Sequence, residues 1–379
     1  MKCKLSDICS FRKGKISVDG LNRSTYISTE NMLPNKCGIT EASSLPTVQL
    51  TQEYKKGDVL VSNIRPYFKK IWKATYDGGC SNDVLVFAAN SNTDKDFLYY
   101  ILANDDFFAY SMATSKGTKM PRGDKTSIMK YEVPVMDIEL QRRIASILKS
   151  IDEKIELNNA INNNLEQQAQ AIFENEFLSL QSLPDGWKQA SLIDIADYLN
   201  GLAMQKYRPS ANEIGIPVLK IKELRQGCCD DNSEFCSPSI KSDYIIHDGD
   251  VIFSWSGSLL VDFWCGGICG LNQHLFKVSS SNYDKWFYYA WTKHHLDRFI
   301  AVAADKATTM GHIKRDELAK AEVLIPNETY YNRIGALLQP IYDLIISNRI
   351  ENKKLAETRD SLLPKLMSGE IDMSEVDYE

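Results

Sequence analysis

A short segment in the first half of the sequence combines basic and aromatic side chains in a pattern that suits contact with nucleic acid. The nine residues 65–73 include four basic and three aromatic side chains. Lysine and arginine neutralise backbone phosphates, and arginine can also donate two hydrogen bonds to guanine. The segment predicts a DNA-contacting loop or hairpin with the candidates Arg65, Tyr67, Lys69, Lys70 and Lys73. The alternative is a solvated β-hairpin whose rings face the core.

A second basic group follows in a segment that glycine and proline mark as a loop. Gly117, Pro121 and Gly123 favour turns over regular structure. Several cations in one loop would supply the salt-dependent part of an affinity for DNA. The candidate phosphate contacts here are Lys116, Lys119, Arg122 and Lys125.

Matching positions in the second half of the chain are more polar. Hydroxyl, amide and imidazole groups can bond to base edges, whereas lysine and arginine can hold phosphates. Gln273 and His274 stand between two apolar runs, so a core or loop role suits them equally well. The candidates in this half are Trp255, Ser256, Ser258, Gln273, His274, Lys306, Thr308, Thr309, His312, Lys314 and Arg315.

The sequence carries no constellation typical of a methyltransferase or a nuclease. The glycine-rich stretch 266–270 lacks the spacing and setting of a nucleotide-binding loop. Residues 152–154 form a carboxylate-x-lysine triplet, but they fall inside a helical heptad pattern, so we interpret the triplet as chance. The five histidines show neither Ser–His–Asp nor HExxH spacing. We therefore predict a chain that is not an enzyme and binds no cofactor itself.

The nine cysteines form no CxxC pair, which excludes the usual signature of a zinc ribbon. Buried or incidental thiols are the favoured interpretation. The alternative is a metal site built from Cys228, Cys229, Cys236, Cys265 and Cys269.

Composition limits the class of protein. A length of 379 residues predicts two or three domains, and 44% apolar with 25% charged residues is ordinary for a globular chain. No run of about 18 apolar residues or signal peptide is found, so we expect a cytoplasmic location without membrane contact. The net charge is −6, and only residues 1–139 carry an excess of basic side chains, of three. DNA binding would therefore need local patches or a partner that shares the phosphate contacts.

Two long helices are predicted to position these candidates. Apolar residues recur every seven positions from Ile144 to Ile172, which is the period of a helix packed on another long helix. The pattern returns from Ile334 to Leu355. Since Pro340 lacks a backbone N–H, we expect a kink there, or a continuous helix from about Pro340 to about Leu363.

The register of the two helices depends on one polar position in each seam. Asn158 and Asn348 occupy equivalent places, so in an antiparallel pair we expect the two amides to hydrogen-bond to each other. The alternative is two solvated asparagines. About 30 helical residues at roughly 1.5 Å each would separate two globular units by about 45 Å, compared with about 34–36 Å for one turn of B-DNA.

The globular units repeat as well. Residues 248–254 echo residues 56–62, and Asn327 stands where Asp137 stands in the first copy, as the expected helix cap. We predict an α+β fold: two duplicated globular domains separated by two long helices that form an antiparallel intramolecular coiled coil, with pseudo-twofold symmetry.

The chain resembles the specificity subunits of type I restriction-modification systems along nearly its whole length. The resemblance rests on the twin helices and on four motifs: Lys56-Gly57-Asp58-Val59-Leu60-Val61-Ser62-Asn63-Ile64-Arg65-Pro66, Gly249-Asp250-Val251-Ile252-Phe253, Met310-Gly311-His312-Ile313 and Leu362-Leu363-Pro364-Lys365-Leu366-Met367-Ser368-Gly369-Glu370-Ile371. It implies target recognition domains at 1–137 and 187–326, conserved spacer helices at 138–180 and 328–370, and an acidic tail at 371–379.

The resemblance also implies the partners. Each domain would read one half of a split, asymmetric site in double-stranded DNA. Two modification subunits would dock on the spacers, hold S-adenosylmethionine and methylate adenine, and restriction subunits, with ATP, would complete the nuclease. The alternative is a bivalent coiled-coil scaffold that holds two protein-binding modules without DNA specificity.

Overall fold

The computed structural model describes residues 1–230, 232–305, 313 and 315–373. The chain divides into two compact units. Unit 1 consists of residues 1–153 with the chain from 355 onward, and unit 2 consists of residues 154–354. The candidates Lys306, Thr308, Thr309, His312 and Lys314 lie outside the described residues.

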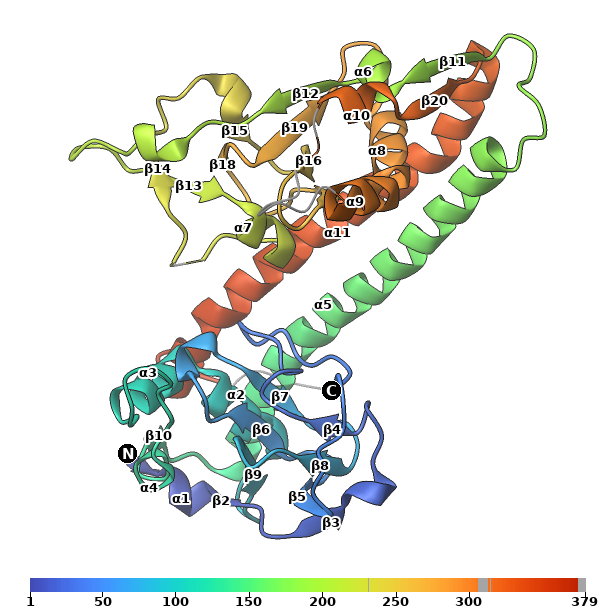
Figure 1. Ribbon diagram of the computed structural model, residues 1–379. Coiled ribbons are helices and arrows are strands. Elements are labelled where there is room, and N and C mark those ends of the chain that lie inside the picture. Colours follow the sequence, from blue (N-terminus) through green and yellow to red (C-terminus); the bar gives the residue numbers. More distant parts are fainter. Residues whose placement is uncertain (231, 306–312, 314, 374–379) are drawn as a thin grey trace. The chain divides into compact units, whose positions relative to one another are not determined.

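Unit 1 is built on sheets that are antiparallel except for the pair β4 and β8, with helices packed beside them (Figure 1). Its main sheet has the order β2-β9-β6-β7, a second has the order β3-β5-β8-β4, and β1 pairs with β10. The strands are β1 (Lys2–Lys4), β2 (Cys9–Phe11), β3 (Lys15–Ser17), β4 (Tyr26–Ile27), β5 (Leu50–Tyr54), β6 (Val59–Ser62), β7 (Ile71–Lys73), β8 (Gly78–Cys80), β9 (Val84–Ala89) and β10 (Glu132–Pro134). The helices are α1 (Leu5–Ile8), α2 (Lys95–Ala103), α3 (Asp105–Ala113) and α4 (Lys125–Ile128), with a 3-10 turn η2 (Pro66–Phe68).

Unit 2 repeats this plan. Its main sheet has the order β12-β19-β16-β17, a second has the order β14-β13-β18-β15, and β11 pairs with β20. The strands are β11 (Lys188–Ser191), β12 (Asp197–Asn200), β13 (Ile216–Leu219), β14 (Phe235–Cys236), β15 (Ile245–Ile246), β16 (Val251–Ser254), β17 (Leu260–Phe263), β18 (Cys269–Leu271), β19 (Leu275–Ser279) and β20 (Glu322–Ile325). The helices are α6 (Leu192–Ile195), α7 (Ile221–Gln226), α8 (Lys285–His294), α9 (Leu296–Asp305) and α10 (Arg315–Ala319).

The duplication extends to individual backbone contacts. The amide of Gly57 donates to the carbonyl of Ala74 at 2.7 Å, and the amide of Gly249 donates to Trp264 at 2.7 Å. Both glycines have positive φ angles, 91° and 86°, which a residue with a Cβ atom rarely adopts. The two echoing motifs therefore make the same turn before the central strands β6 and β16, and the predicted duplication is confirmed.

The two long helices are α5 (Ile138–Phe173), extended by a π-helical turn Glu174–Leu178, and α11 (Glu328–Ser368). Figure 1 draws them as uninterrupted ribbons, α5 in green and α11 in orange to red. Their N-terminal caps are as predicted: Asp137 accepts from the amide of Leu140 at 2.8 Å, and Asn327 accepts from Tyr330 at 3.1 Å.

The prediction that α11 starts near Pro340 and ends near Leu363 is wrong, because the helix passes through both Pro340 and Pro364. Each proline leaves the carbonyl four residues before it without an amide donor, at Ala336 and Asp360. All four of these residues are exposed, so water can satisfy the freed carbonyls.

The aromatic segment 94–112 forms two helices, α2 and α3. Asn104 ends α2 in an extended conformation, and its side chain accepts from the amide of Asp106, which caps α3. The strong N-cap preference of asparagine explains the break.

Within each unit, segments of α5 and α11 pack antiparallel. In unit 2, Asn158 pairs with Asn352, and Glu176 pairs with Arg333. In unit 1, Asp152 pairs with Arg359 at 2.7 Å. The second oxygen of Asp152 accepts from the Tyr100 hydroxyl at 2.6 Å, so this carboxylate ties α2 to the helices and has a structural role.

The predicted hydrogen bond between Asn158 and Asn348 is wrong. The amide of Asn158 donates to Glu351 at 2.7 Å and to Asn352 at 2.8 Å, and Asn348 donates to Asn162 at 2.8 Å. Since Asn162 lies one helical turn after Asn158, the register is shifted by one turn. Asn158, Asn162 and Asn348 are all buried, which excludes the solvated alternative.

Each globular core continues into its part of the helix pair. In unit 1, Ile144 and Leu148 pack with Leu363 and Leu366 against α2 and β6. In unit 2, Phe173 and Ile334 join the core formed by α8 and the main sheet. None of the helices in the described part of the chain is both long enough and apolar enough to cross a lipid bilayer.

Candidate nucleic-acid interface

The two basic segments that the sequence predicts separately in unit 1 lie side by side. The amide of Gly123 donates to the carbonyl of Asn63 at 3.1 Å, and the amide of Arg65 donates to Pro121 at 2.8 Å. Ile64 and Arg122 form an isolated antiparallel bridge. The loop after β6 and the loop before α4 therefore form one surface at the C-terminal end of the central strand.

Most cations of this surface have acidic partners within the unit. Lys69 pairs with Asp105 at 2.8 Å, Lys116 pairs with Asp124 at 2.7 Å and Arg122 pairs with Asp83 at 3.3 Å. The hydrogen bond from Lys116, with those from Ser127, lowers the pKa of Asp124 to about 2. The carboxylates hold the cations in place and also reduce the local positive charge.

Two further lysines also have partners within unit 1, and their contact with DNA stays a prediction. Lys73 forms an ion pair with Asp96 of α2. Lys70 donates to the carbonyl of Thr29 at 2.6 Å, and burial lowers the pKa of its ammonium group. Lys119 and Lys125, in contrast, are exposed and have no ion pair with any residue that the structure describes.

The loop after β6 leaves two polar atoms without partners. Within the described chain, Oδ1 of Asn63 and Nε of Arg65 are buried and have no hydrogen-bond partner. Such groups are rare in folded proteins, because each costs about 1–3 kcal/mol. Tyr67 and Phe68, which follow directly, are 49% and 37% exposed.

Unit 2 brings its equivalent loops together through the same contact. The amide of Ile313 donates to the carbonyl of Trp255 at 3.0 Å, as Gly123 donates to Asn63 in unit 1. The side chains differ. Oγ of Ser256 lies 3.1 Å from Nδ1 of His274, and Nε2 of His274 lies 3.3 Å from the amide of Gln273.

The remaining candidates of unit 2 form hydrogen bonds within the unit. The indole of Trp255 donates to Asn200 at 3.0 Å, and Ser256 is 1% exposed. The carbonyl of Ser258 accepts from Ser254 at 2.9 Å. Arg315 is exposed, and its guanidinium donates to the carbonyl of Tyr198 at 3.1 Å. Contact of these residues with DNA stays a prediction.

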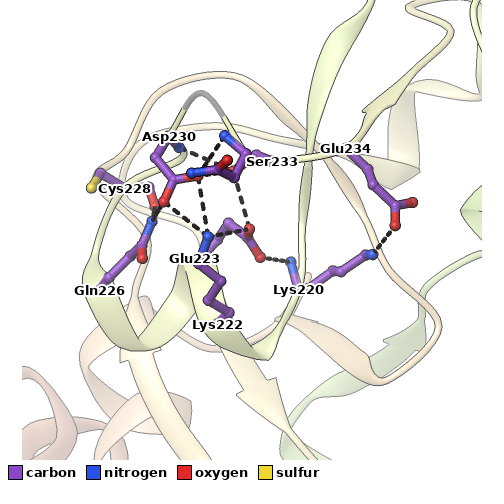
Figure 2. A network of polar contacts seen from close by, with 9 residues as sticks. Lys220, Lys222, Glu223, Gln226, Cys228, Asp230, Ser233 and Glu234 are labelled. Carbon is purple, nitrogen blue, oxygen red and sulfur yellow. Dashed lines mark hydrogen bonds and ion pairs between the residues drawn. The ribbon is translucent and has the colours of Figure 1, made fainter. Parts of the chain in front are cut away.

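A polar network beside the loop of unit 2 was not found from the sequence. Figure 2 shows Lys222 and Gln226 of α7 reaching the carboxylate of Asp230, at 2.9 Å and 3.4 Å. Glu223, which is 3% exposed, accepts from the amide of Lys220 and from the hydroxyl of Ser233. The available signal was Glu223 itself, because an acidic residue at the third position of a helix can accept from the amide that precedes the helix.

This network lies close to the loop that carries Ser256. A Cβ atom at Gly257 would be 3.7 Å from Ile221 of α7. The two lysines of the network are paired with carboxylates, Lys220 with Glu234 at 2.6 Å and Lys222 with Asp230. The network therefore ties α7 to Asp230, Ser233 and Glu234 and adds little net charge to the surface.

The cysteines are separate thiols. All nine are free, and the described residues hold no group of three or more His, Cys, Asp or Glu side chains placed to bind a metal ion. Burial raises the pKa of Cys265 to about 11 and that of Cys229 to about 12. Protonated thiols are poor metal ligands.

Comparisons with known proteins identify the family. The model of the type I restriction modification DNA specificity domain matches twice, over residues 1–167 and 184–357. The MjaIX specificity subunit of Methanocaldococcus jannaschii is 26% identical over 74% of this chain and 70% of its own length. The HindI specificity subunit of Haemophilus influenzae is 22% identical over 91% of this chain and 94% of its own.

A solved structure has the same fold. The crystal structure of a type I restriction-modification S subunit from M. genitalium aligns with a TM-score of 0.55 at 15% identity, over 99% of this chain and 96% of that one. Because the family model covers both halves, including both loop surfaces, the chain belongs to the type I restriction-modification DNA specificity family and contains two copies of its domain.

Proposed function

We propose that the chain reads a bipartite, asymmetric site in double-stranded DNA, one half with each unit, and that it does so as a cytoplasmic, non-catalytic subunit. Residues 1–137 and 187–326 would be the two recognition domains. The relatives named above are specificity subunits of restriction enzymes, and this chain would have the same task in its own complex.

One observation carries the proposal. Both units build the same loop-to-loop contact at the end of the central strand, Gly123 to Asn63 and Ile313 to Trp255, but present different side chains there. The same backbone contact with different side chains suits two domains that recognise two different half-sites. The unpartnered polar atoms of Asn63 and Arg65 support the presence of a polar ligand at the first surface.

The partners would supply the chemistry. In this proposal two modification subunits hold S-adenosylmethionine and methylate adenine, restriction subunits use ATP, and this chain binds neither cofactor. The helix pair of unit 2 offers a docking surface, because Leu157 and Ile161 of α5 and Leu337 and Leu344 of α11 remain 36–55% exposed. Exposed apolar side chains on a helix pair suit contact with a protein partner.

Electrophoretic shift and methylation-sensitive sequencing test the proposal together. The chain co-expressed with its modification subunit should retard duplex DNA, and the methylome should contain one interrupted asymmetric motif that disappears when this chain is deleted. The rival hypothesis is a protein scaffold without DNA specificity. It would be supported by a complex that binds the modification subunit but leaves the methylome without such a motif.

A further inference from the structure

The turn η2 of unit 1 exposes two adjacent aromatic rings at the centre of the candidate interface. Tyr67 is 49% exposed and Phe68 is 37% exposed, and their ring centroids are 4.7 Å apart. The ammonium group of Lys70 lies 5.8 Å from the centre of the Phe68 ring. The two rings together form an exposed apolar surface next to a cation.

The backbone around these rings is strained. Within the described chain, only four residues other than glycine have a positive φ angle: Asn35, Lys36, Arg65 and Lys69. All four belong to this region of the chain. Arg65 and Lys69 flank η2, and the amides of Asn35 and Lys36 are hydrogen-bonded to Phe68 and Lys69. Strain of this kind costs roughly 1–3 kcal/mol per residue and clusters at functional sites.

Hydrogen bonds fix the turn in this conformation. The amide of Asn35 donates to the carbonyl of Phe68 at 2.8 Å, and the amide of Lys36 donates to that of Lys69 at 2.9 Å. Inside the turn, Phe68 donates to Arg65 at 3.0 Å. The loop that contains Asn35 and Lys36 therefore supports the backbone of the aromatic pair.

The carboxylate of Asp105, the first residue of α3, contacts both the turn η2 and the loop that supports it. Asp105 accepts from Lys69 at 2.8 Å and pairs with Lys36 at 2.9 Å. The side chain of Lys36 is only 13% exposed, so this lysine acts as an anchor. Burial raises the pKa of Asp105, but the hydrogen bonds from Lys69 and Lys36 outweigh it, and the net pKa lies below the usual range.

We propose that Tyr67 and Phe68 form an apolar wedge that enters a base step of the first half-site, and that Asp105, through Lys36 and Lys69, positions it. The inference rests on the proposed function and adds the mode of contact. Proteins that kink DNA insert rigid apolar side chains between bases, while neighbouring cations hold the backbone. The strained, tethered turn supplies that rigidity.

The wedge belongs to one half-site only. In unit 2 the ring at the equivalent loop, Trp255, donates to Asn200 and packs on Phe276 with centroids 5.6 Å apart. These contacts hold its ring on the main sheet of unit 2. Because pyrimidine–purine steps unstack most easily, the first half-site should contain such a step where the second needs none.

The test uses the full chain in complex with its modification subunit. The probes are a duplex with the target mapped from the wild-type methylome and a scrambled duplex of equal length. The variant Tyr67→Ala/Phe68→Ala should bind the target about 10- to 100-fold more weakly, with an unchanged slope of log K against log salt, because no cation is lost. Tyr67→Leu/Phe68→Leu should restore most of the affinity, since leucine also serves as a wedge.

Two measurements separate the wedge from simpler explanations. With 2-aminopurine at successive positions of the first half-site other than the methylated base, the wild type should raise the fluorescence at one step and the alanine variant should not. Leu50→Ala is the matched control for a 55% exposed apolar side chain elsewhere in unit 1 and should change nothing.

Asp105→Asn should change the affinity for DNA in opposite directions under two hypotheses. If the wedge needs its anchor, this variant binds the target more weakly although the chain has become less acidic. If Asp105 only masks phosphate-binding lysines, the variant binds all DNA more tightly. Asp77→Asn makes the same charge change beyond the other end of β6, where Asp77 accepts from the amide of Lys56, and should be neutral.

Three results would overturn the wedge: full affinity of the double alanine variant, a loss accompanied by a flatter salt slope, or a loss of modification-subunit binding with unchanged DNA affinity. A wild-type complex that does not distinguish target from scrambled duplex would instead refute the proposed function itself.

Discussion

At the scale of single residues, the partners of each cation decide which of them can hold phosphate. Lys69, Lys73, Lys116 and Arg122 have carboxylate partners in unit 1, whereas Lys119 and Lys125 are exposed without an ion pair in the described chain. We therefore predict that Lys119→Ala/Lys125→Ala weakens binding to target and scrambled duplexes alike, by roughly ten-fold. The salt slope should become shallower by about 1.8, as for two lost phosphate contacts.

The matched control for this pair is Lys69→Ala. Because Lys69 forms an ion pair with Asp105, its loss should leave the salt slope unchanged. The affinity for the target should still fall, because Tyr67 and Phe68 would no longer be held in position. An unchanged slope in Lys119→Ala/Lys125→Ala, measured by fluorescence anisotropy from 50 to 200 mM salt, would remove this loop from the interface.

A buried histidine gives the chain a pH-dependent stability. His295 is 8% exposed and its Nε2 lies 2.8 Å from the carbonyl of Glu322. Burial lowers the pKa of His295 from 6.5 to about 4. Between these values the unfolded chain binds a proton that the folded chain does not, so stability falls as pH falls.

We predict that the free energy of unfolding drops by about 2 kcal/mol more in the wild type than in His295→Gln between pH 7.5 and pH 5. The glutamine amide can still donate to Glu322 but does not titrate. Urea unfolding of both proteins at the two pH values measures the difference. Parallel pH profiles would show that His295 titrates normally in the folded chain.

At the scale of the elements, the helix register in unit 2 depends on buried amides. Asn348 donates to Asn162, and Asn162 lies 3.4 Å from the carbonyl of Ile345. Asn348→Leu leaves the oxygen of Asn162 without its donor, and we predict a loss of about 2 kcal/mol in the free energy of unfolding. Asn162→Leu should cost a similar amount.

The double variant Asn162→Leu/Asn348→Leu should regain most of this loss, because two apolar side chains replace a satisfied polar pair. Urea unfolding of the four proteins gives the coupling energy directly. Additive losses would mean that the two amides act independently, against the hydrogen bond between them.

The elements were predictable to the extent that their signals are local. Seven-residue periodicity, the caps Asp137 and Asn327 and the glycine turns before β6 and β16 lie within short windows, and all are confirmed. The register was not predictable in this way. In unit 2 it is set partly by Arg349, which bonds to Asp262 of β17 at 2.6 Å and to Glu166 of α5 at 2.8 Å.

For the candidate interface of unit 1, the sequence identified the segments that form it but not the contacts between their side chains. The two basic segments of unit 1 were found because their composition is unusual. The pairing of Lys69 with Asp105 and the support from Lys36 depend on residues far apart in the sequence, so composition alone could not reveal them. The sequence places Lys69 among the DNA contacts, which stays a prediction, but it gives no sign of the ion pair with Asp105.

At the scale of the whole molecule, the duplication predicts that the two halves of the target can be altered separately. Each unit has its own core and its own loop contact, and no candidate reader is shared between the units. We predict that His274→Ala, which removes the partner of Ser256 and Gln273, relaxes the methylated motif in one half only. Lys119→Ala/Lys125→Ala should leave the motif intact and lower the extent of methylation.

The variant that combines His274→Ala with Lys119→Ala/Lys125→Ala should show both effects, because independent sites contribute additively to binding. Its loss of binding free energy should equal the sum of the two separate losses within about 0.5 kcal/mol. Methylation-sensitive sequencing reads the motif, and anisotropy with the mapped duplex reads the affinity. If His274→Ala instead relaxed both halves together, the reading of one half-site would depend on the other. Two similar folds in one chain would then act as a single recognition surface, and the split of the target between the units would have to be abandoned.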